Sequence, residues 1–331
     1  MKKILVTGGT GFIGIHLVKR LSELGHSLKL LVRETSDTSP FEELKNIEYS
    51  IGDTRDIESL RKAVENVDLI YHLAAYTGIW AKDKSIYHDI NVKGTENVAK
   101  LALEKDIHLY YVSSFTAIGP TPPEPVDETY EKMDFEMEYE KSKNAGKKVV
   151  KDYINKGLKA VIFYPGIVYG PGDFNIFGEM LYDIVRGKFL GCPGDGESMA
   201  CLSYIPDLVE GMVSAIDRSD IFGEDFILGG ENIKFGDYLD LIAEIADQKK
   251  PRHFPMAGAK LYAALCELKA KITKKKPYIT RPTLTALNYH RSYSSDKAIE
   301  KLNYKITPLR QGLEETIKWY QDYIEQEKNK K

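Results

Sequence analysis

Lys3-Ile4-Leu5-Val6-Thr7-Gly8-Gly9-Thr10-Gly11-Phe12-Ile13-Gly14 opens the chain and decides its fold. The apolar residues at 3–7 predict a buried strand, and glycines follow it at once. An amphipathic pattern then continues to Leu21, and Gly25 predicts the end of that helix. Residues 28–32 are again apolar and predict a second strand. Strand, glycine turn, helix and strand in this order predict a dinucleotide-binding unit.

The glycines of this turn have separate physical roles. Gly8 allows a tight turn, Gly11 lets the backbone approach a pyrophosphate, and Gly14 lets the helix pack close to the strand. The helix N-terminus offers free N–H groups and the positive end of its dipole to phosphates. We therefore expect the cofactor to contact this turn, at Gly8, Thr10, Gly11, Phe12, Ile13 and Gly14. A glycine turn that binds nothing is the structural alternative.

Composition excludes several classes of protein. The chain has 331 residues, 43% of them hydrophobic and 29% charged, as expected of a globular protein with two lobes. Its net charge of −3 gives no electrostatic reason to expect nucleic acid. No uncharged stretch approaches the roughly 18 residues that span a bilayer. Cys192, Cys201 and Cys266 lack metal-ligand spacing, so we expect reduced thiols, no metal and a cytoplasmic location.

Strands and helices alternate through the first half of the chain. Residues 47–51, 67–75, 107–113 and 159–164 read as apolar strands, and 91–104 is one of the helical patterns between them. This alternation predicts an α/β fold with a doubly wound parallel sheet. Ligands of such sheets bind outside the carboxyl ends of the strands, so functional residues are expected there.

A proton donor is predicted in Tyr139-Glu140-Lys141-Ser142-Lys143. Tyr139 and Lys143 are four residues apart and share one face of a helix. A nearby ammonium would lower the phenol pKa from about 10, so this pair suits general acid–base chemistry. Ser114 ends a predicted strand, where its hydroxyl would donate a hydrogen bond to a substrate oxygen. Thr116 is expected to face the substrate as well.

Together these motifs resemble the extended branch of the short-chain dehydrogenase/reductase superfamily, over nearly the whole chain. The Gly-x-x-Gly-x-x-Gly spacing after Thr7 carries the resemblance, with Ser114, Tyr139 and Lys143. It implies a Rossmann-type sheet with a smaller α/β substrate-binding lobe on the C-terminal side, and Ser114, Tyr139 and Lys143 as catalytic residues. The implied division is a cofactor domain at 1–169 with a returning segment at 203–232, a lobe at 170–202 and 233–325, and a frayed tail at 326–331.

The end of the second strand bears on the choice of cofactor. Val32 stands where an acidic residue would bind the ribose of NAD, and Arg33 follows it. Arg33 would accommodate the 2′-phosphate of NADP, as in the dihydroflavonol reductases that the chain resembles. NADP is therefore expected, with NAD as the alternative and Arg33 then a surface residue.

The resemblance also implies further cofactor contacts along the strand ends. Asp53 would contact the adenine with Thr54 beside it, although Asp53 would also suit a helix cap. The remaining contacts are expected at Leu73, Ala74, Ala75, Tyr139, Lys143, Tyr164, Pro165, Gly166 and Val168. Asn91 resembles a family position that stabilises the centre of the sheet.

Two departures narrow the reaction. Dehydratases of this branch carry Asp-Glu after the catalytic hydroxyl residue, where this chain has Phe115 and Thr116. Sugar-nucleotide enzymes often carry Asn at the position of Ile167. The resemblance is therefore greatest to the dihydroflavonol reductase and 3β-hydroxysteroid dehydrogenase group. Its implied substrate contacts are Tyr76, Trp80, Ser114, Thr116 and Tyr169, with packing in the core as the alternative role of Tyr76 and Trp80.

These observations predict an NADP-dependent oxidoreductase that acts on a carbonyl or alcohol of a small, fairly apolar molecule. The alternative is an NAD-dependent sugar-nucleotide epimerase with the same Ser-Tyr-Lys set. A dinucleotide sensor without catalysis is a third reading, although a sensor has no need of Tyr139 and Lys143. A homodimer through the helices at 91–104 and 139–153 is also expected.

Two segments leave alternatives open. Residues 119–130 contain four prolines and precede acidic residues around Asp134, so they form either a lid over the substrate or a solvated loop. The amphipathic stretch at 257–272 has two possible roles. It contacts a membrane surface or a hydrophobic substrate, or it packs on the core of the lobe.

Overall fold

A parallel sheet forms the centre of the computed structural model, which describes residues 1–132, 135–189, 191–274, 277 and 279–329. Its strands lie in the order β10-β6-β5-β4-β1-β2-β3, and every neighbouring pair is parallel. The predicted doubly wound fold is confirmed. The strands are β1 (Lys3–Thr7), β2 (Ser27–Val32), β3 (Ile47–Ile51), β4 (Leu69–His72), β5 (His108–Val112), β6 (Ala160–Pro165) and β10 (Asp225–Leu228).

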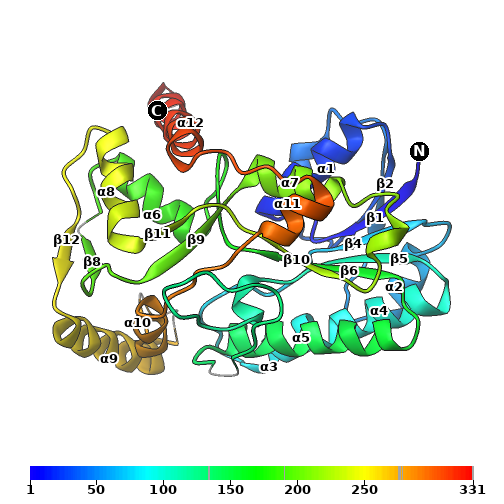
Figure 1. Ribbon diagram of the computed structural model, residues 1–331, viewed down its shortest axis with the longest axis horizontal. Helices are drawn as coiled ribbons and strands as arrows, with labels where there is room; N and C mark the ends of the chain where they lie inside the picture. Colours follow the sequence, from blue (N-terminus) through cyan, green and yellow to red (C-terminus); the bar gives the residue numbers. More distant parts are fainter. Residues whose placement is uncertain (133–134, 190, 275–276, 278, 330–331) are drawn as a thin grey trace.

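Helices cover both faces of this sheet, as Figure 1 shows. One face carries α1 (Phe12–Glu23), α7 (Ile205–Val213) and α11 (Asp296–Leu302). The other face carries α2 (Ile57–Ala63), α4 (Thr95–Glu104) and α5 (Glu138–Asn155). Successive residues of β1 enter opposite clusters, with Ile4 and Val6 on the first face and Leu5 on the second. Burial on both faces is the reason that these strands are apolar throughout.

The rest of the chain forms a smaller α/β lobe, drawn on the left of Figure 1. A three-stranded sheet there contains β7 (Ile167–Tyr169), β9 (Met199–Tyr204) and β11 (Asn232–Lys234), and β8 (Gly191–Pro193) pairs with β12 (Arg252–Phe254). The lobe helices are α6 (Ile176–Val185), α8 (Phe235–Ile245), α9 (Met256–Thr273), α10 (Arg281–Leu287) and α12 (Leu309–Asn329). Residues 326–329 of the expected tail continue α12, whereas residues 330–331 and Asp134 lie outside the described residues.

The chain also contains short helical segments between these elements. Three are 3-10 turns at Ser39–Phe41, Phe115–Ala117 and Ser219–Ile221, and α3 spans Ser85–His88. Asn91 lies in a π-helical turn, Asp89–Gly94, that precedes α4, whereas the sequence predicted regular helix from this residue. The Thr95 hydroxyl donates to the Asn91 carbonyl oxygen at 2.8 Å, and the Asn91 side chain bonds outside its own helix.

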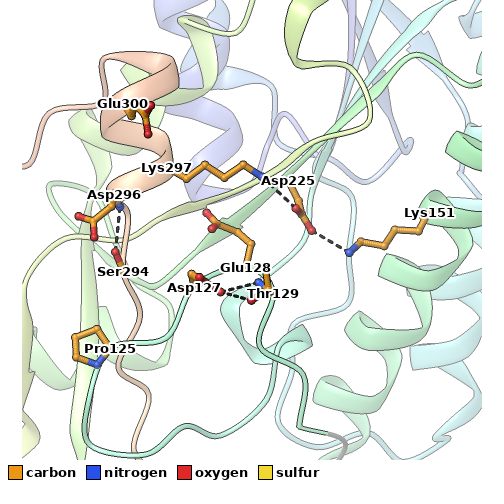
Figure 2. Close-up of a pocket in the computed structure, with 10 residues that line it drawn as sticks. All are labelled: Pro125, Asp127, Glu128, Thr129, Lys151, Asp225, Ser294, Asp296, Lys297 and Glu300. Carbon is orange, nitrogen blue, oxygen red and sulfur yellow. Dashed lines mark hydrogen bonds and ion pairs between the residues drawn. The ribbon is translucent and has the colours of Figure 1, made fainter.

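The proline-rich segment has no regular helix or strand, as predicted, but it is tied to the lobe. Thr121 N donates to the carbonyl oxygen of His290 at 2.9 Å, and Val126 N donates to that of Ser292 at 3.1 Å. A cavity of about 630 Å³ lies beside this segment, at the outer edge of β10 (Figure 2). It is lined by Pro125, Asp127, Glu128, Thr129, Lys151, Asp225, Ser294, Asp296, Lys297 and Glu300, and none of these is a predicted site residue.

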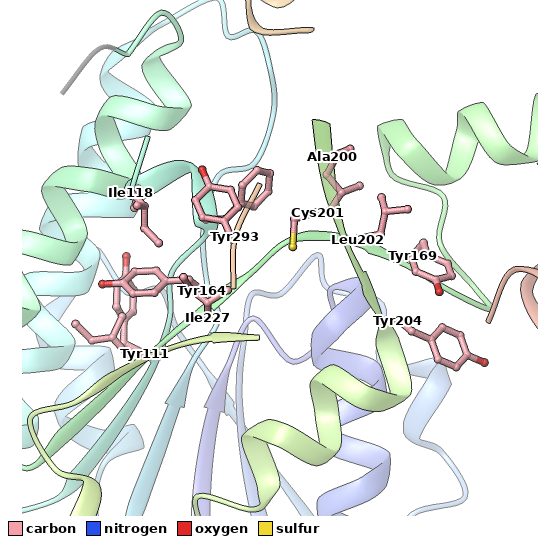
Figure 3. Close-up of a cluster of buried hydrophobic side chains, with 14 of the residues drawn as sticks. Tyr111, Ile118, Tyr164, Tyr169, Ala200, Cys201, Leu202, Tyr204, Ile227 and Tyr293 are labelled. Atoms are coloured by element: carbon pink, nitrogen blue, oxygen red, sulfur yellow. The ribbon is translucent and has the colours of Figure 1, made fainter. Parts of the chain in front are cut away.

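One buried cluster continues from the main sheet into the lobe. Figure 3 shows Tyr164 of β6 and Ile227 of β10 in the same cluster as Cys201 and Leu202 of β9. The chain leaves the main sheet at Pro165, the last residue of β6, as its missing N–H predicts. The lobe is therefore joined to the sheet through packed side chains as well as through the backbone.

The glycine turn packs against the turn that follows β4. Gly8 has a φ of +74°, and a Cβ atom added to it would lie 2.6 Å from the backbone nitrogen of Ala74. A Cβ atom on Gly14 would overlap the carbonyl oxygen of Gly8 and lie 2.7 Å from the Cα of Gly9. Both positions therefore require glycine, Gly8 through its conformation and its neighbour, Gly14 through its neighbours alone.

Gly14→Ala should reduce the free energy of unfolding by about 3 kcal/mol, because the added methyl group has no space beside rigid backbone. Urea denaturation followed by circular dichroism would measure the change. Gly258→Ala is the matched control, since that helical glycine of α9 has no heavy atom within 4 Å of an added Cβ. Equal stabilities of the two variants would contradict this account of the turn.

Candidate active site

The ends of β1 and β4 are joined by a hydrogen-bonded histidine. The hydroxyl of Thr7 lies 2.7 Å from His72 Nδ1 and accepts from Ala74 N at 3.3 Å. His72 Nε2 lies 3.0 Å from the hydroxyl of Thr95 on α4. Burial lowers the pKa of His72 to about 3, so the ring is neutral and acts as a bridge. This role of His72 was not predicted from the sequence, where a histidine within an apolar strand was the available signal.

The first turn of α1 offers backbone groups that suit a phosphate. Gly11 is the N-cap, and the first turn contains no acidic residue. The initial N–H groups of a helix have no partner within it and carry its positive dipole end. A Cβ added to Gly11 would meet only the carbonyl oxygen of Gly8, at 3.4 Å, so little covers this backbone. The predicted residues of this turn therefore fit a pyrophosphate group.

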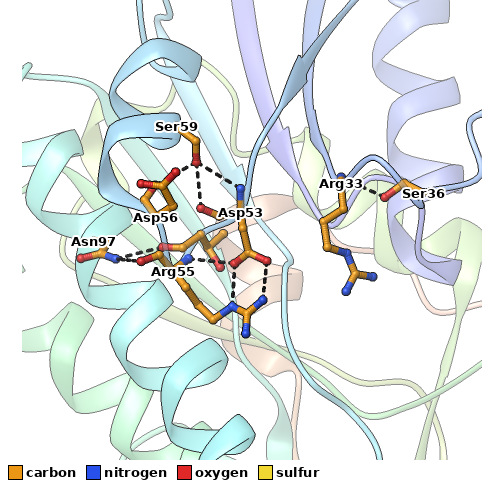
Figure 4. A network of polar contacts seen from close by, with 8 residues as sticks. Arg33, Ser36, Asp53, Arg55, Asp56, Ser59 and Asn97 are labelled. Atoms are coloured by element: carbon orange, nitrogen blue, oxygen red, sulfur yellow. Dashed lines mark hydrogen bonds and ion pairs between the residues drawn. The ribbon is translucent and has the colours of Figure 1, made fainter.

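The residues predicted near the adenosine form a charged group, drawn in Figure 4. The Arg55 guanidinium donates two hydrogen bonds to the Asp53 carboxylate, from Nε at 2.9 Å and from Nη2 at 2.8 Å. Arg55, with a smaller effect from the exposed Arg33, holds the pKa of Asp53 below its usual value. The N-cap of α2 is Asp56, which accepts from Glu58 N at 3.0 Å, so capping as the alternative role of Asp53 is wrong.

The other residues predicted along the strand ends lie against α4 or against the glycine turn. Thr54 is buried, and its carbonyl oxygen accepts from Asn97 Nδ2 at 3.0 Å. Leu73, Ala74 and Ala75 form the partly buried turn after β4, beside the glycine turn. Their backbone therefore lies at the carboxyl edge of the sheet, where the sequence placed a cofactor.

Ser114 and Thr116 interact directly in a turn just beyond β5. Ser114 is the N-cap of the 3-10 turn at Phe115–Ala117. Its oxygen accepts from Thr116 N at 3.2 Å and from the Thr116 hydroxyl at 3.0 Å. Because these bonds use the oxygen as an acceptor, the hydroxyl proton of Ser114 stays available to a third group. Thr116 is directed at Ser114, although the sequence analysis expected it to face the substrate.

Helix α5 brings Tyr139 and Lys143 to the same strand end. Lys143 Nζ donates to the carbonyl oxygen of Val112, the last residue of β5, at 3.0 Å. The Ser142 hydroxyl donates to the carbonyl oxygen of Tyr139 at 2.7 Å and accepts from Asn91 Nδ2 at 2.8 Å. The first turns of α5 are thus fastened both to the strand that precedes Ser114 and to the turn containing Asn91.

Burial dominates the electrostatics of Tyr139 and Lys143. It raises the pKa of Tyr139, and a hydrogen bond with Ser114 acts in the opposite direction. Burial also lowers the pKa of Lys143 from 10.5 to about 7. The expectation that Lys143 lowers the pKa of Tyr139 is wrong for the protein alone. The physical reason is that the lysine amine is itself desolvated and points at the Val112 carbonyl oxygen.

Asn91 positions the loop that carries two of the expected substrate contacts. Tyr76 N donates to Asn91 Oδ1 at 2.7 Å, and Asn91 Nδ2 donates to the carbonyl oxygen of Tyr76 at 3.0 Å. The Tyr76 hydroxyl in turn donates to the carbonyl oxygen of Trp80 at 3.0 Å. Both aromatic side chains are partly buried. Asn91 also contacts Ser142, so it links this loop to α5.

Residues 164–169 make several contacts within the protein. Tyr164 is buried, and its hydroxyl donates to Asp225 at 3.0 Å. Gly166 N donates to the Ser203 hydroxyl at 2.9 Å, whereas Pro165 lacks an N–H and Val168 is partly buried in β7. Tyr169 is only 2% exposed and packs on Tyr204 in the core of the lobe (Figure 3). Substrate contact by Tyr169 would require this core to open.

A buried ion pair between Arg291 and Glu140 joins the lobe to the start of α5. The Arg291 guanidinium bonds to Glu140, whose other oxygen accepts from Met137 N at 3.2 Å. Arg291 also lies over the Phe115 ring, 5.5 Å from its centroid. Arg291 therefore contacts Phe115, the neighbour of Ser114, and Glu140, the neighbour of Tyr139. This ion pair was not predicted from the sequence, where the available signal was Glu140, an acid within the predicted catalytic helix.

Comparison with known proteins identifies the relatives of this chain. Residues 4–229 match the model of the NAD dependent epimerase/dehydratase family. The chain is 27% identical to sterol demethylase protein B of Methylococcus capsulatus, over 96% of this chain and 98% of the relative. It is 26% identical to a putative dihydroflavonol 4-reductase of Synechocystis, over 96% of this chain and 94% of the relative. Sugar-nucleotide decarboxylases and epimerases also occur among the matches.

Solved structures share the fold over the whole chain. The crystal structure of gox2253 superposes with a TM-score of 0.83 at 33% identity and covers 98% of this chain and 99% of its own. The same arrangement of main sheet and lobe therefore exists in a related protein.

Arg291→Met should reduce the free energy of unfolding by about 3 kcal/mol or more, because Glu140 would remain buried without its partner. Urea denaturation would measure the loss. Arg310→Met is the matched control, since Arg310 pairs with Glu244 at 2.7 Å on the surface. The free energy of unfolding of this variant should hardly differ from that of wild type. An equal, small effect of both substitutions would show that the buried pair is dispensable.

Lys143→Met should change how stability depends on pH. Between about pH 7 and 10.5 the unfolded chain holds the lysine proton and the folded chain does not, so wild-type stability rises with pH in that window. The variant lacks this dependence. The free energy of unfolding of Lys143→Met, relative to that of wild type, should be highest below pH 7. Above pH 7 this difference should fall by about 1.4 kcal/mol per pH unit.

Urea denaturation at pH 7.5 and pH 9 would measure this difference. Lys148→Met, at an exposed position on the same helix, is the control. Its difference in stability from wild type should be the same at both pH values. A Lys143→Met difference that is also independent of pH would contradict the lowered pKa.

Proposed function

The chain belongs to the NAD dependent epimerase/dehydratase family, and we propose that it is an NADP-dependent oxidoreductase of the extended short-chain dehydrogenase/reductase type. It would transfer a hydride to or from the carbonyl or alcohol carbon of a small, fairly apolar substrate. One observation carries this proposal. The bond from Lys143 to the Val112 carbonyl oxygen brings a Tyr-Lys helix to the strand end that carries Ser114, beside the glycine turn.

The proposed chemistry assigns each of these side chains a task. Tyr139 gives a proton to the substrate oxygen during reduction and takes it back during oxidation. The Ser114 hydroxyl, which hydrogen-bonds with Tyr139, would donate to that oxygen instead of to Tyr139. Lys143, which donates to the Val112 carbonyl oxygen, would offer its other N–H groups to the nicotinamide ribose. The dinucleotide, when bound, supplies or accepts the hydride.

Three side chains support NADP as the dinucleotide. Val32 provides no carboxylate to the ribose, and Arg33 is exposed just beyond it. The Asp53 carboxylate is neutralised by Arg55, so it would not repel a 2′-phosphate. NAD is the alternative, consistent with the family description.

The substrate class follows from what the site lacks and from the relatives. Phe115 and Thr116 provide no acid–base pair for elimination, and the Ile167 side chain offers no hydrogen bond to a sugar. Relatives named for sterol demethylation and dihydroflavonol reduction favour an apolar substrate with a ring ketone or alcohol. Sugar-nucleotide epimerisation is the second candidate, because the family description names epimerases and solved structures of UDP-sugar epimerases share the fold.

Tyr139→Phe should lower kcat by about 10²- to 10⁴-fold, because the substrate oxygen loses its proton donor. The measurement is consumption of NADPH with a panel of flavonoid and steroid ketones, together with binding of NADPH to both proteins. Tyr153→Phe, on the same helix, is the matched control and should keep full activity. Full turnover by Tyr139→Phe would refute the assignment, and interconversion of UDP-sugars without net oxidation of NADPH would favour the epimerase.

Arg33→Gln should weaken NADPH binding about ten- to a hundredfold, since a charged hydrogen-bond donor to the 2′-phosphate is lost. NADH binding should stay within about twofold, because NADH has no such phosphate. Titration calorimetry with both dinucleotides would measure this. Arg61→Gln, which removes a charge from the surface of α2, is the control. It should change the affinity for neither NADPH nor NADH. Equal weakening for NADPH and NADH would contradict the role of Arg33.

A further inference from the structure

Helix α9 presents four large apolar side chains to solvent, whereas its fully buried side chains are alanines. Leu261, Leu265, Leu268 and Ile272, here called the α9 stripe, are 66%, 57%, 56% and 75% exposed. The side chains buried beneath them are Ala263 and Ala270, on the side that packs against α10. An ordinary surface helix has the reverse arrangement, because burial of large apolar side chains is what stabilises it.

The α9 stripe is continuous along one face. Its members follow one another at intervals of four, three and four residues, so they lie within about 60° of arc around the helix axis. Figure 1 places α9 at the margin of the molecule, with α10 beside it. The sequence analysis left open whether this helix packs on the lobe or meets a membrane. The lobe covers only the face of small residues.

Lysines border the α9 stripe on both sides. Lys260 and Lys271 lie about 90° to 110° from its centre on one side, and Lys269 lies about 70° from it on the other. All are exposed. The acidic residue of the helix, Glu267, is neutralised by Arg281, which contacts it at 2.9 and 3.0 Å. The face that surrounds the stripe is therefore positively charged.

We propose that α9 docks in the plane of an anionic membrane surface, with the stripe among the acyl chains and the lysines at the lipid headgroups. Apolar side chains flanked by lysines are the arrangement that interfacial helices use. No helix in the described part of the chain is long and apolar enough to cross a bilayer, so this contact lies along the surface. A second copy of the chain fits less well, because facing stripes would bring their lysine borders together.

Flotation with vesicles tests this proposal without any need for catalysis. The full chain should float with vesicles of phosphatidylcholine and phosphatidylglycerol, and far less with phosphatidylcholine alone. Leu265→Gln with Leu268→Gln should weaken partitioning at least about tenfold, because apolar area drives insertion. Lys260→Glu with Lys269→Glu and Lys271→Glu should weaken it about a hundredfold or more on the anionic vesicles.

Leu24→Gln with Ile299→Gln is the matched control, since these side chains are 43% and 44% exposed away from α9. It should float as wild type does, and all variants should keep the wild-type circular dichroism and oligomeric mass. The proposal is overturned if wild type does not bind anionic vesicles, or if the stripe variant binds them equally. It is also overturned if the stripe variant dissociates an oligomer in the absence of lipid, which would assign the stripe to a second copy.

Discussion

The site depends on the close approach of the glycine turn to the turn after β4. Only a hydrogen atom fits between Gly8 and the backbone of Ala74, and this contact fixes two strand ends side by side. A chain of hydrogen bonds then runs from Thr7 through His72, Thr95, Asn91 and Ser142 to the backbone of Tyr139. The nucleotide end and the proton donor are therefore parts of one buried network, which limits how either can move.

Local chemistry made much of the fold predictable from the sequence. The turn at residues 8–14 is set by sterics within a few residues, and strands buried on both faces show as apolar runs. The pairing of Arg291 with Glu140 was not predictable, because 151 residues separate them and only the fold brings them together. The pKa of Tyr139 was misjudged for a similar reason, since spacing indicates a neighbouring amine but not its desolvation.

The lobe meets the site through a few specific contacts. The ion pair of Arg291 with Glu140 fastens the lobe beside Tyr139, and the segment at 120–130 hydrogen-bonds to the lobe segment at 290–294. The same lobe carries the α9 stripe, on a helix that packs against α10 (Figure 1). Docking of this helix on lipid would place the lobe near a source of apolar substrates, in line with the proposed substrate class.

The most direct test of the central claim is a crystal structure of the protein with NADPH. The account predicts that the pyrophosphate lies on the first turn of α1, the 2′-phosphate beside Arg33, and the nicotinamide ribose on Lys143, with the ring facing the hydroxyl groups of Ser114 and Tyr139. A dinucleotide bound elsewhere, or a nicotinamide directed away from Tyr139, would contradict it.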